Sequence, residues 1–179
     1  MNTLIPKIKR LSEAAILPKR ATEGAVAYDV FVPKDTVVKK GRQVIPLGFA
    51  IELPNCNYEA KIEPRSGFSS KGMEGYSRRI VYEHVFDTRL VGGVSKKMVE
   101  YIAAQPDRFN ADVLVGKIDS DYRGEVGVII KSDDDKEFVI KAGTRIAQMT
   151  FYNVPETVLT EVEELTETER EGGFGSTGV

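Results

Sequence analysis

The chain has 179 residues, of which 41% are hydrophobic, and a formal net charge of -2. This length and composition are typical of one globular domain with its own core. The slightly acidic balance excludes the basic surface that duplex DNA or an anionic membrane requires, so we expect neither nucleic acid nor membrane as a partner. One cysteine excludes an internal disulfide, and one histidine excludes a His-rich zinc site and disfavours a Ser-His-Asp triad. The first residues lack a long apolar stretch and a small-residue cleavage site, so we expect an intracellular, cytoplasmic protein.

Short β patterns occupy most of the chain. The stretches "QVIPLGFAIELP" (43–54) and "NYEAKIEP" (57–64) are typical of strands that end at prolines. In "GEVGVIIKS" (124–132), apolar side chains alternate, which predicts a half-buried strand. The stretch 136–154 predicts two strands joined by a turn at Gly143. Many short strands separated by turn residues favour an all-β fold, a jelly roll or barrel.

One segment, "VSKKMVEYIAAQPDRF" (94–109), has helical spacing instead. Ser95 is a candidate N-cap, Pro106 would end the helix, and an apolar stripe lies between them, formed by Met98, Val99, Ile102 and Ala103. We therefore predict a single β-barrel domain over 1–160 with a helical insertion at 75–110. The acidic stretch from about 161 predicts a flexible linker to a glycine-rich C-terminal arm, with 161–179 forming both.

Two stretches carry side chains suited to phosphate chemistry. In "EPRSGFSSKG" (63–72), Arg65 and several hydroxyls beside Gly67 can hold phosphate oxygens, although an ordinary surface turn is the alternative. In "GKIDSDYRGEVG" (116–127), Asp119 and Asp121 would point the same way on an extended chain, and one could take a proton from water. The alternative is a type I turn that begins at aspartate. The following Tyr122 offers an aromatic face to a flat or sugar-like ligand.

Three weaker signals lie elsewhere. In "AVAYDVFVP", Asp29 stands among apolar residues and needs a partner, which could be backbone amides or the waters of a magnesium ion. In "GTRIAQM", Arg145 is expected to be a structural ion-pair residue, and Gln148 could donate to an anion. The terminal "REGGFGSTGV" combines an arginine and hydroxyls with glycine amides, which can form an anion-binding nest.

The stretches "AYDVFVP", "PRSGFSSKG", "GKIDSDYRGEVGV", "GTRIAQMTF" and "REGGFGSTGV", in this order, resemble the five motifs of the trimeric all-β dUTPase family. The resemblance implies a distorted jelly roll and a homotrimer whose C-terminal arm closes over a neighbouring subunit's site. It implies hydrolysis of dUTP to dUMP and pyrophosphate with Mg²⁺, which lowers dUTP and supplies dUMP for thymidylate synthesis.

The resemblance also implies a role for individual residues. Asp119 matches the general base that activates water for attack on the α-phosphorus, and Tyr122 matches the ring that packs against the deoxyribose. Asp29 matches a residue at the water shell of the metal. The phosphate contacts would come from Arg65, Ser66, Gly67 and Gln148. The nucleoside would be bound along Gly116, Lys117, Ile118 and Gly127, and the arm would contribute Arg170, Phe174, Gly175, Ser176 and Thr177.

The chain departs from the family pattern at two positions. Ala27 stands where the family commonly has glycine, and Val113 where it commonly has an asparagine that contacts uracil, with Asp112 and Asn110 nearby. Two alternative functions stay open on the same fold. One is a dCTP deaminase or a bifunctional deaminase–dUTPase, and the other is a regulatory binding protein whose insertion docks an unidentified protein partner.

Overall fold

The computed structural model describes residues 3–86 and 93–168, which form fourteen strands and one short helix. The strands before the helix are β1 (Lys7–Arg10), β2 (Tyr28–Phe31), β3 (Thr36–Val38), β4 (Gly41–Pro46), β5 (Phe49–Glu52) and β6 (Tyr58–Glu63). Helix α1 (Ser66–Lys71) is followed by β7 (Met73–Phe86), β8 (Val94–Ile102), β9 (Asp107–Phe109), β10 (Ala111–Leu114), β11 (Gly116–Ile118), β12 (Gly127–Ser132), β13 (Phe138–Ile140) and β14 (Arg145–Asn153). The predicted all-β class is confirmed.

The strands form four antiparallel sheets that wrap one core. Their orders are β1-β5, β10-β12-β4, β11-β6-β14-β2, and β3-β13-β7-β8 with β9 paired to β7. Neighbours in a sheet are mostly distant in sequence, as expected for a jelly-roll type of connection rather than for simple hairpins. The core residues that are largest and fully buried include Phe49, Phe138, Ile45, Leu47 and Ile62.

The strands predicted from alternation are present with the expected faces. Val126, Val128 and Ile130 are each at most 1% exposed, so this side of β12 faces the core as predicted. The turn between β13 and β14 contains Gly143 at φ +80°, a left-handed conformation that glycine adopts without steric cost. Local sequence therefore determined both the faces and this turn.

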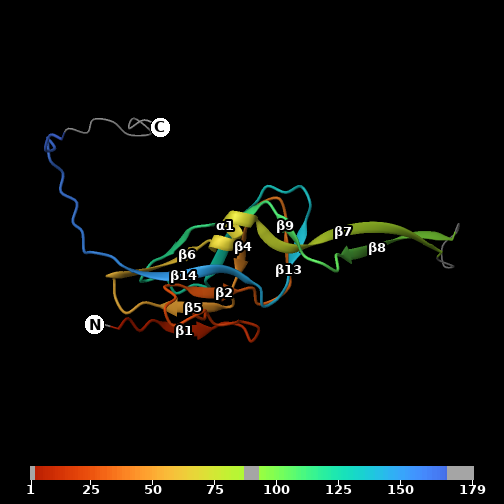
Figure 1. Cartoon of the computed structure of the whole chain (residues 1–179), viewed down its shortest axis with the longest axis horizontal. Coiled ribbons are helices and arrows are strands. Elements are labelled where there is room, and N and C mark those ends of the chain that lie inside the picture. Colours follow the sequence, from red (N-terminus) through yellow and green to blue (C-terminus); the bar gives the residue numbers. More distant parts are fainter. Residues whose placement is uncertain (1–2, 87–92, 169–179) are drawn as a thin grey trace.

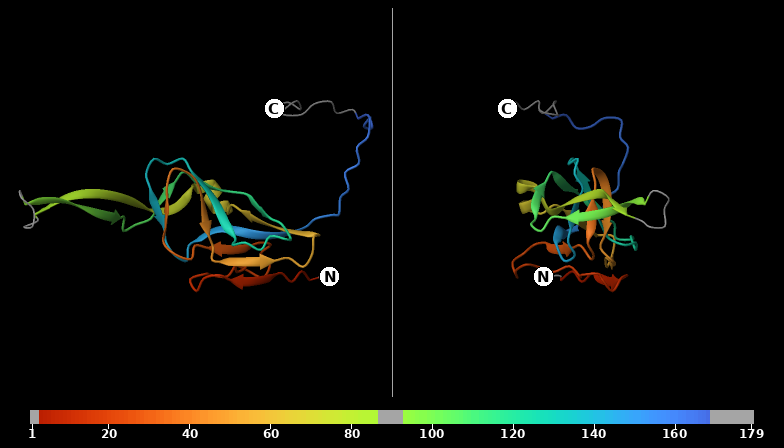
Figure 2. Two further views of the ribbon diagram at one scale, coloured as in Figure 1. Left: turned by 180° about the vertical axis from the view of Figure 1, so that it is seen from behind. Right: turned by 90° about the vertical axis from the view of Figure 1, so that its right-hand side faces the viewer.

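The predicted helix at 94–109 is wrong, because this segment contains strand β8. β8 pairs with β7 in nine consecutive register positions, from Arg78↔Ile102 to Phe86↔Val94. The apolar spacing that resembled a helical stripe is also compatible with a strand, and β7 is rich in β-branched and aromatic residues. Figures 1 and 2 show the result, a long β-hairpin that projects from the body of the molecule.

The base of this insertion belongs to the core, whereas its outer part does not. The ring of Phe109 stacks on that of Phe138 with centroids 4.1 Å apart, and Met73, two residues before the expected insertion, is fully buried. A Cβ on Gly75 would lie 2.4 Å from Cδ2 of Phe138, so the two strands approach closely here. The expected boundaries 75–110 thus include core residues, and the peripheral part is the β7–β8 hairpin beyond Arg78.

Shortening the hairpin should therefore leave the fold intact. In the first variant, residues 80–100 are replaced by Asn-Gly, a two-residue turn that fits between the opposed Arg79 and Tyr101. We expect its free energy of unfolding to stay within about 1 kcal/mol of the parent value, because no apolar side chain at 80–86 or 94–100 belongs to the buried core.

The matched variant is Phe109→Ala, which empties a core position and should cost about 3–5 kcal/mol. Urea unfolding followed by circular dichroism measures both variants. A shortened chain that unfolds as readily as Phe109→Ala would show that the outer hairpin is needed for the fold.

After β14 the chain leaves the body. The amide of Val154 donates to the carbonyl of Asn57 (2.7 Å), and residues 155–168 then run as an exposed segment without helix or strand (Figures 1 and 2). This is the segment in which the linker was expected. In the described part of the chain no helix is long and apolar enough to cross a membrane.

Candidate active site

A short turn follows β6 and exposes the predicted phosphate-holding residues. Pro64 ends the strand, and Arg65 has extended backbone angles (φ -86°, ψ 139°) immediately before α1. The carbonyl of Arg65 accepts the amides of Phe68 (2.9 Å) and Ser69 (3.0 Å), which fixes the first turn. The buried Phe68 anchors the helix to the core, so Ser66 and Gly67 face solvent at a fixed position.

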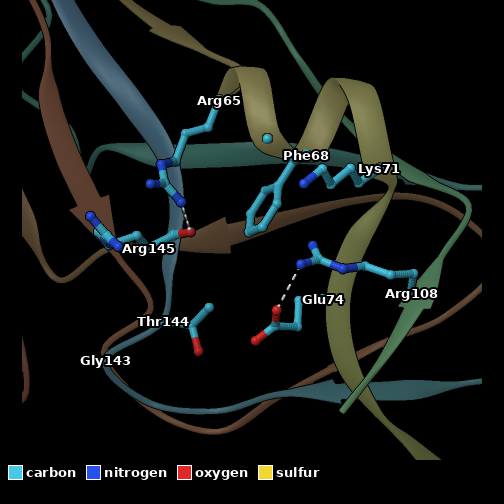
Figure 3. A pocket seen from close by; sticks show the side chains of 9 residues that line it. Arg65, Phe68, Lys71, Glu74, Arg108, Gly143, Thr144 and Arg145 are labelled. Carbon is cyan, nitrogen blue, oxygen red and sulfur yellow. Dashed lines mark hydrogen bonds and ion pairs between the residues drawn. The ribbon is translucent and has the colours of Figure 1, made fainter.

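The Asp29 carboxylate links two arginines, one before α1 and one at the start of β14. Its Oδ1 lies 3.1 Å from Nε of Arg65, and its Oδ2 lies 3.4 Å from a guanidinium nitrogen of Arg145. Arg65 also donates to the carbonyl of Arg145 at 3.2 Å (Figure 3). The Asp29 side chain is only 13% exposed, so the two guanidinium groups supply the partners that a mostly buried carboxylate needs. The structural ion-pair role expected for Arg145 is confirmed, whereas its pairing with Asp29 had no sequence signal.

Sheet register brings Gln148 to the same place. On β14, Gln148 lies opposite Glu63 of β6 on one side and opposite Asp29 of β2 on the other. A cavity of about 380 Å³ opens there, with Ala27, Asp29 and Gln148 in its wall. Three of the five predicted motifs therefore meet at one end of the β11-β6-β14-β2 sheet. Ala27, which departs from the family pattern, lines the cavity.

The predicted catalytic aspartate lies in a turn, not on an extended strand. The amide of Tyr122 donates to the carbonyl of Asp119 (3.1 Å), which closes a turn directly after β11. The alternative of a turn that begins at aspartate is thus confirmed for this stretch. Asp119 and Asp121 are both exposed. An exposed carboxylate in a fixed turn is accessible to water and ligand.

Tyr122 is held against its own loop. Its hydroxyl donates to the carbonyl of Glu125 (3.0 Å), and a Cβ on Gly124 would lie 2.4 Å from that hydroxyl oxygen. The ring therefore lies over Gly124, and a larger residue at this position would require the Tyr122 ring to move. The residue stays 45% exposed, so its ring is accessible to a ligand.

Asp119 and the phosphate turn lie at opposite ends of β6. Ile118 pairs with Ala60 near the start of β6, and Asp119 follows, whereas Arg65 lies beyond the other end of the strand. The five steps from Ala60 to Arg65 correspond to roughly 16 Å of extended chain. The two groups of one chain are therefore too far apart to contact the same phosphate.

The remaining predicted residues divide between strand positions and residues outside the described range. Gly116, Lys117 and Ile118 form β11, and Gly127 begins β12, where a Cβ would lie 2.6 Å from Val44. Val113 is 4% exposed and faces the core, so it cannot contact a base as asparagine does in the family pattern. The arm residues lie outside the described residues, namely Arg170, Phe174, Gly175, Ser176 and Thr177.

The described residues suit a magnesium ion that is bound to the substrate and contacts the protein through water. Within 3–86 and 93–168, no three His, Cys, Asp or Glu side chains cluster to hold a metal. Magnesium commonly keeps several waters and binds one or two carboxylates together with substrate phosphates. Asp29, whose two oxygens retain acceptor capacity beside Arg65 and Arg145, suits an ion that arrives on a triphosphate and contacts the protein through water.

The fold and the two turns are those of a nucleotide hydrolase of the jelly-roll type, and comparisons with known proteins agree. The dUTPase family model matches residues 13–99 and 107–178. The deoxyuridine 5'-triphosphate nucleotidohydrolase of Syntrophotalea carbinolica is 37% identical, covering 99% of this chain and 99% of its own length. The protein of the same name from Paramecium bursaria Chlorella virus 1 is 34% identical, covering 96% of each chain. This chain belongs to the dUTPase family.

Solved structures support the same assignment. A mutant of the Staphylococcus bacteriophage 80alpha dUTPase with dUpNHpp matches with a TM-score of 0.71 and 25% identity, covering 98% of this chain and 99% of that one. A mutant dUTPase from phage phi11 of S. aureus, which coordinates a structural Mg(II) ion, matches with a TM-score of 0.62 and 21% identity, covering 89% and 97%. The second likeness concerns the fold alone.

Glu59 fixes β11 next to the Asp119 turn and should make stability depend on pH. Its carboxylate lies 3.0 Å from Nζ of Lys61 and 3.2 Å from Nζ of Lys117. The hydrogen bond from Lys61, with a further contribution from Lys117, holds the pKa of Glu59 below its usual value of 4.5. A lowered pKa in the folded state adds stability above the pKa of the unfolded chain, and this is lost as pH falls through the folded value.

The Glu59→Gln variant should therefore be less stable than the parent at pH 6, by under about 1 kcal/mol because Lys117 is exposed. The difference should shrink towards pH 3. Urea unfolding at both pH values measures it, with exposed Glu23→Gln as the control. A Glu59→Gln deficit that is the same at both pH values would contradict this assignment.

Proposed function

We propose that this chain hydrolyses dUTP to dUMP and pyrophosphate. The observation that carries the proposal is the full-length similarity to deoxyuridine 5'-triphosphate nucleotidohydrolases, in which the motif residues occupy two solvent-facing turns of the matching fold. One turn presents a carboxylate beside an aromatic ring, and the other presents an arginine, a hydroxyl and a glycine. These are the groups that water activation and phosphate binding require.

Asp119 is the general base. Its carboxylate takes a proton from a water molecule while the water oxygen forms a bond to the α-phosphorus. The bond from that phosphorus to the bridging oxygen of the β-phosphate breaks, and pyrophosphate leaves with the bonding electrons. The exposure of Asp119 and the main-chain hydrogen bond of its turn support this role, because the carboxylate is accessible and held in place.

The phosphates are bound by the other turn. Arg65, Ser66 and Gly67 hold the triphosphate with Gln148, and Asp29 keeps Arg65 oriented through their ion pair. Catalysis of phosphoryl transfer depends mostly on positioning and charge neutralisation, which is what this cluster supplies. Magnesium bound to the triphosphate would neutralise part of its charge, with Asp29 accepting hydrogen bonds from the water ligands of the metal.

The nucleoside binds along the motif "GKIDSDYRGEVGV". Tyr122 packs beneath the deoxyribose, which leaves no space for a 2′-hydroxyl, and the base approaches the backbone at Gly127. Strand β11, with Gly116, Lys117 and Ile118, forms the adjacent wall of the nucleoside site. The exposure of Tyr122 and the hydrogen bond of its hydroxyl support this assignment.

Each site is assembled between subunits of a homotrimer. The separation of Asp119 from Arg65 along β6 supports this arrangement, because two chains are needed to bring a base and a phosphate turn to one nucleotide. Arg170, Phe174, Gly175, Ser176 and Thr177 form the arm that closes over the site of a neighbour. The last pair of β14, Asn153↔Tyr58, starts the tail at the Asp119 end of β6, away from its own phosphate turn.

The function is tested by incubating the purified chain with Mg²⁺ and dUTP, dCTP, dTTP or UTP, and identifying products by anion-exchange chromatography. We expect dUMP and pyrophosphate from dUTP, with the other nucleotides largely unchanged. Deamination of dCTP would instead favour the deaminase alternative. No turnover of any of the four would contradict the proposed function.

Tyr122→Ala tests sugar selection. Removing the ring should lower kcat/KM for dUTP by about tenfold or more and reduce the preference for dUTP over UTP, because a 2′-hydroxyl is no longer excluded. Steady-state kinetics with both nucleotides measure the ratio. Tyr122→Phe is the matched control, since it keeps the ring and should keep the preference. A dUTP/UTP ratio that is unchanged in Tyr122→Ala would count against this role.

A further inference from the structure

A second pocket, of about 420 Å³, is lined by Arg65 and Arg145, the two arginines that pair with Asp29. Helix α1, the first residues of β7, strand β9 and the turn before β14 enclose it (Figure 3). Its polar wall consists of Arg65, Lys71, Glu74, Arg108, Thr144 and Arg145. Two of these residues, Glu74 and Arg108, face each other across β7 and β9 and belong to none of the five motifs.

Positive charge exceeds negative charge in this pocket. Four cationic side chains line it, whereas Glu74 is the one carboxylate in its described wall. Asp29 pairs with Arg65 and Arg145 but does not line the pocket, and with Glu74 it offsets two of the four positive charges, so that about two remain in excess. Within the described part of the chain, Lys71 has no ion-pair partner. A concave site with this excess favours an anion that carries two charges.

In the Glu74–Arg108 pair, the Glu74 carboxylate occupies the position of a counter-ion that an incoming anion can displace. The two residues lie opposite each other on β7 and β9, and their charged groups are 2.9 Å apart. The side chains are 47% and 44% exposed, so the pair contributes little to stability. Arg108 also donates to the carbonyl of Gly72 at 3.2 Å, which keeps its guanidinium at the rim when Glu74 moves aside.

The other residues of the pocket hold the hydrogen-bond donors Arg65, Thr144 and Arg145 in position. The guanidinium carbon of Arg65 lies 5.6 Å above the centroid of the Phe68 ring, and Phe68 itself is 8% exposed. Gly143, at φ +80°, turns the chain so that Thr144 and Arg145 both line the pocket (Figure 3). The donors therefore come from a helix, a strand and a turn that are anchored separately.

We propose that this pocket is a phosphoryl-group site, in which Lys71 and Arg108 are binding residues and Glu74 is the counter-ion that a phosphate displaces. Guanidinium groups bind phosphate through two parallel hydrogen bonds, and an ammonium adds a point charge. The phosphoryl group is either free pyrophosphate or the terminal phosphate of a bound nucleotide. The nucleotide source rests on the proposed function, whereas the anion site does not.

Calorimetric titration of the full chain with inorganic pyrophosphate tests the site directly. Arg108→Gln and Lys71→Gln should each weaken binding about tenfold, as expected when a hydrogen bond to a charged group is lost. Glu74→Gln should tighten it several-fold, because the competing carboxylate is removed while the side-chain size is kept. Lys97→Gln removes one positive charge from exposed β8, away from the pocket, and should bind like the parent.

The same variants are then titrated with a non-hydrolysable dUTP analogue, which distinguishes the two sources. An effect on pyrophosphate alone identifies a separate site for free pyrophosphate, and a parallel effect on both ligands identifies the terminal-phosphate position. The site would be overturned if Arg108→Gln and Lys71→Gln bound both ligands as tightly as Lys97→Gln does. The counter-ion role would be overturned if Glu74→Gln bound them more weakly than the parent. A chain that binds pyrophosphate as expected but does not turn over dUTP would contradict the proposed function and leave this site standing.

Discussion

Asp119→Asn should lower kcat for dUTP by at least about 100-fold, because an amide cannot accept the proton of the attacking water. Binding of a non-hydrolysable dUTP analogue should change little, since the variant keeps the side-chain shape and loses only an interaction of the transition state. The turn itself should persist, because its hydrogen bond uses the main-chain carbonyl of Asp119 and not the carboxylate. Single-turnover kinetics and calorimetry measure the two effects separately.

Asp121→Asn is the matched control for this variant. Asp121 lies in the same turn, is also exposed, and differs from Asp119 mainly in its position. Its change should leave kcat within a few-fold of the parent value. Equal losses in the two variants would indicate a general electrostatic effect of the turn, and near-normal turnover by Asp119→Asn would exclude it as the base.

Mixing two inactive variants should restore activity if sites are shared between chains. One variant carries Asp119→Asn with a complete C-terminus, and the other ends after Glu169 with Asp119 intact. Each should be nearly inactive alone, because one lacks the base and the other lacks the arm. After joint unfolding and refolding in equal amounts, about one quarter of all sites in randomly assembled trimers should combine an intact base with an arm from another chain.

Specific activity should therefore rise from near zero towards about a quarter of the parent value. Size-exclusion chromatography with light scattering establishes the trimer, and tagging one variant shows that the chains have mixed. Refolding the parent protein in parallel corrects for incomplete recovery. Mixed trimers without restored activity would show that base and arm come from the same chain, and a monomeric parent would contradict the shared site altogether.

Elements that depend on near neighbours were predictable from the sequence. The alternation of Val126, Val128 and Ile130 determined the buried face of β12, and the Gly143 turn between two strands followed from glycine alone. The turn beginning at Asp119 was one of two alternatives that the residues allowed. Each depends on steric limits or side-chain periodicity within a few residues, so no long-range contact is needed to specify it.

The segment 94–109 was mispredicted because its conformation depends on pairing with another strand, β7. Met98, Val99 and Ile102 have the spacing of a helical stripe. The backbone of β8 instead forms its hydrogen bonds with β7, and the periodicity of a single segment does not reveal such a partner. Strand propensity is more dependent on context than helix propensity, since cross-strand packing contributes to it. Phe109, expected in a peripheral insertion, instead stacks on Phe138 in the core.

The sequence by itself determined the all-β class, the motif residues and their order, because alternation and turn chemistry are local. Only the tertiary structure decided how those motifs are arranged: Asp29 pairs with Arg65 and Arg145, while Asp119 lies at the opposite end of β6. It also decided that Arg108 and Lys71 line one pocket with Arg65. These arrangements follow from strand register between segments far apart in the chain, which is set by packing of the whole core rather than by any local stretch of residues.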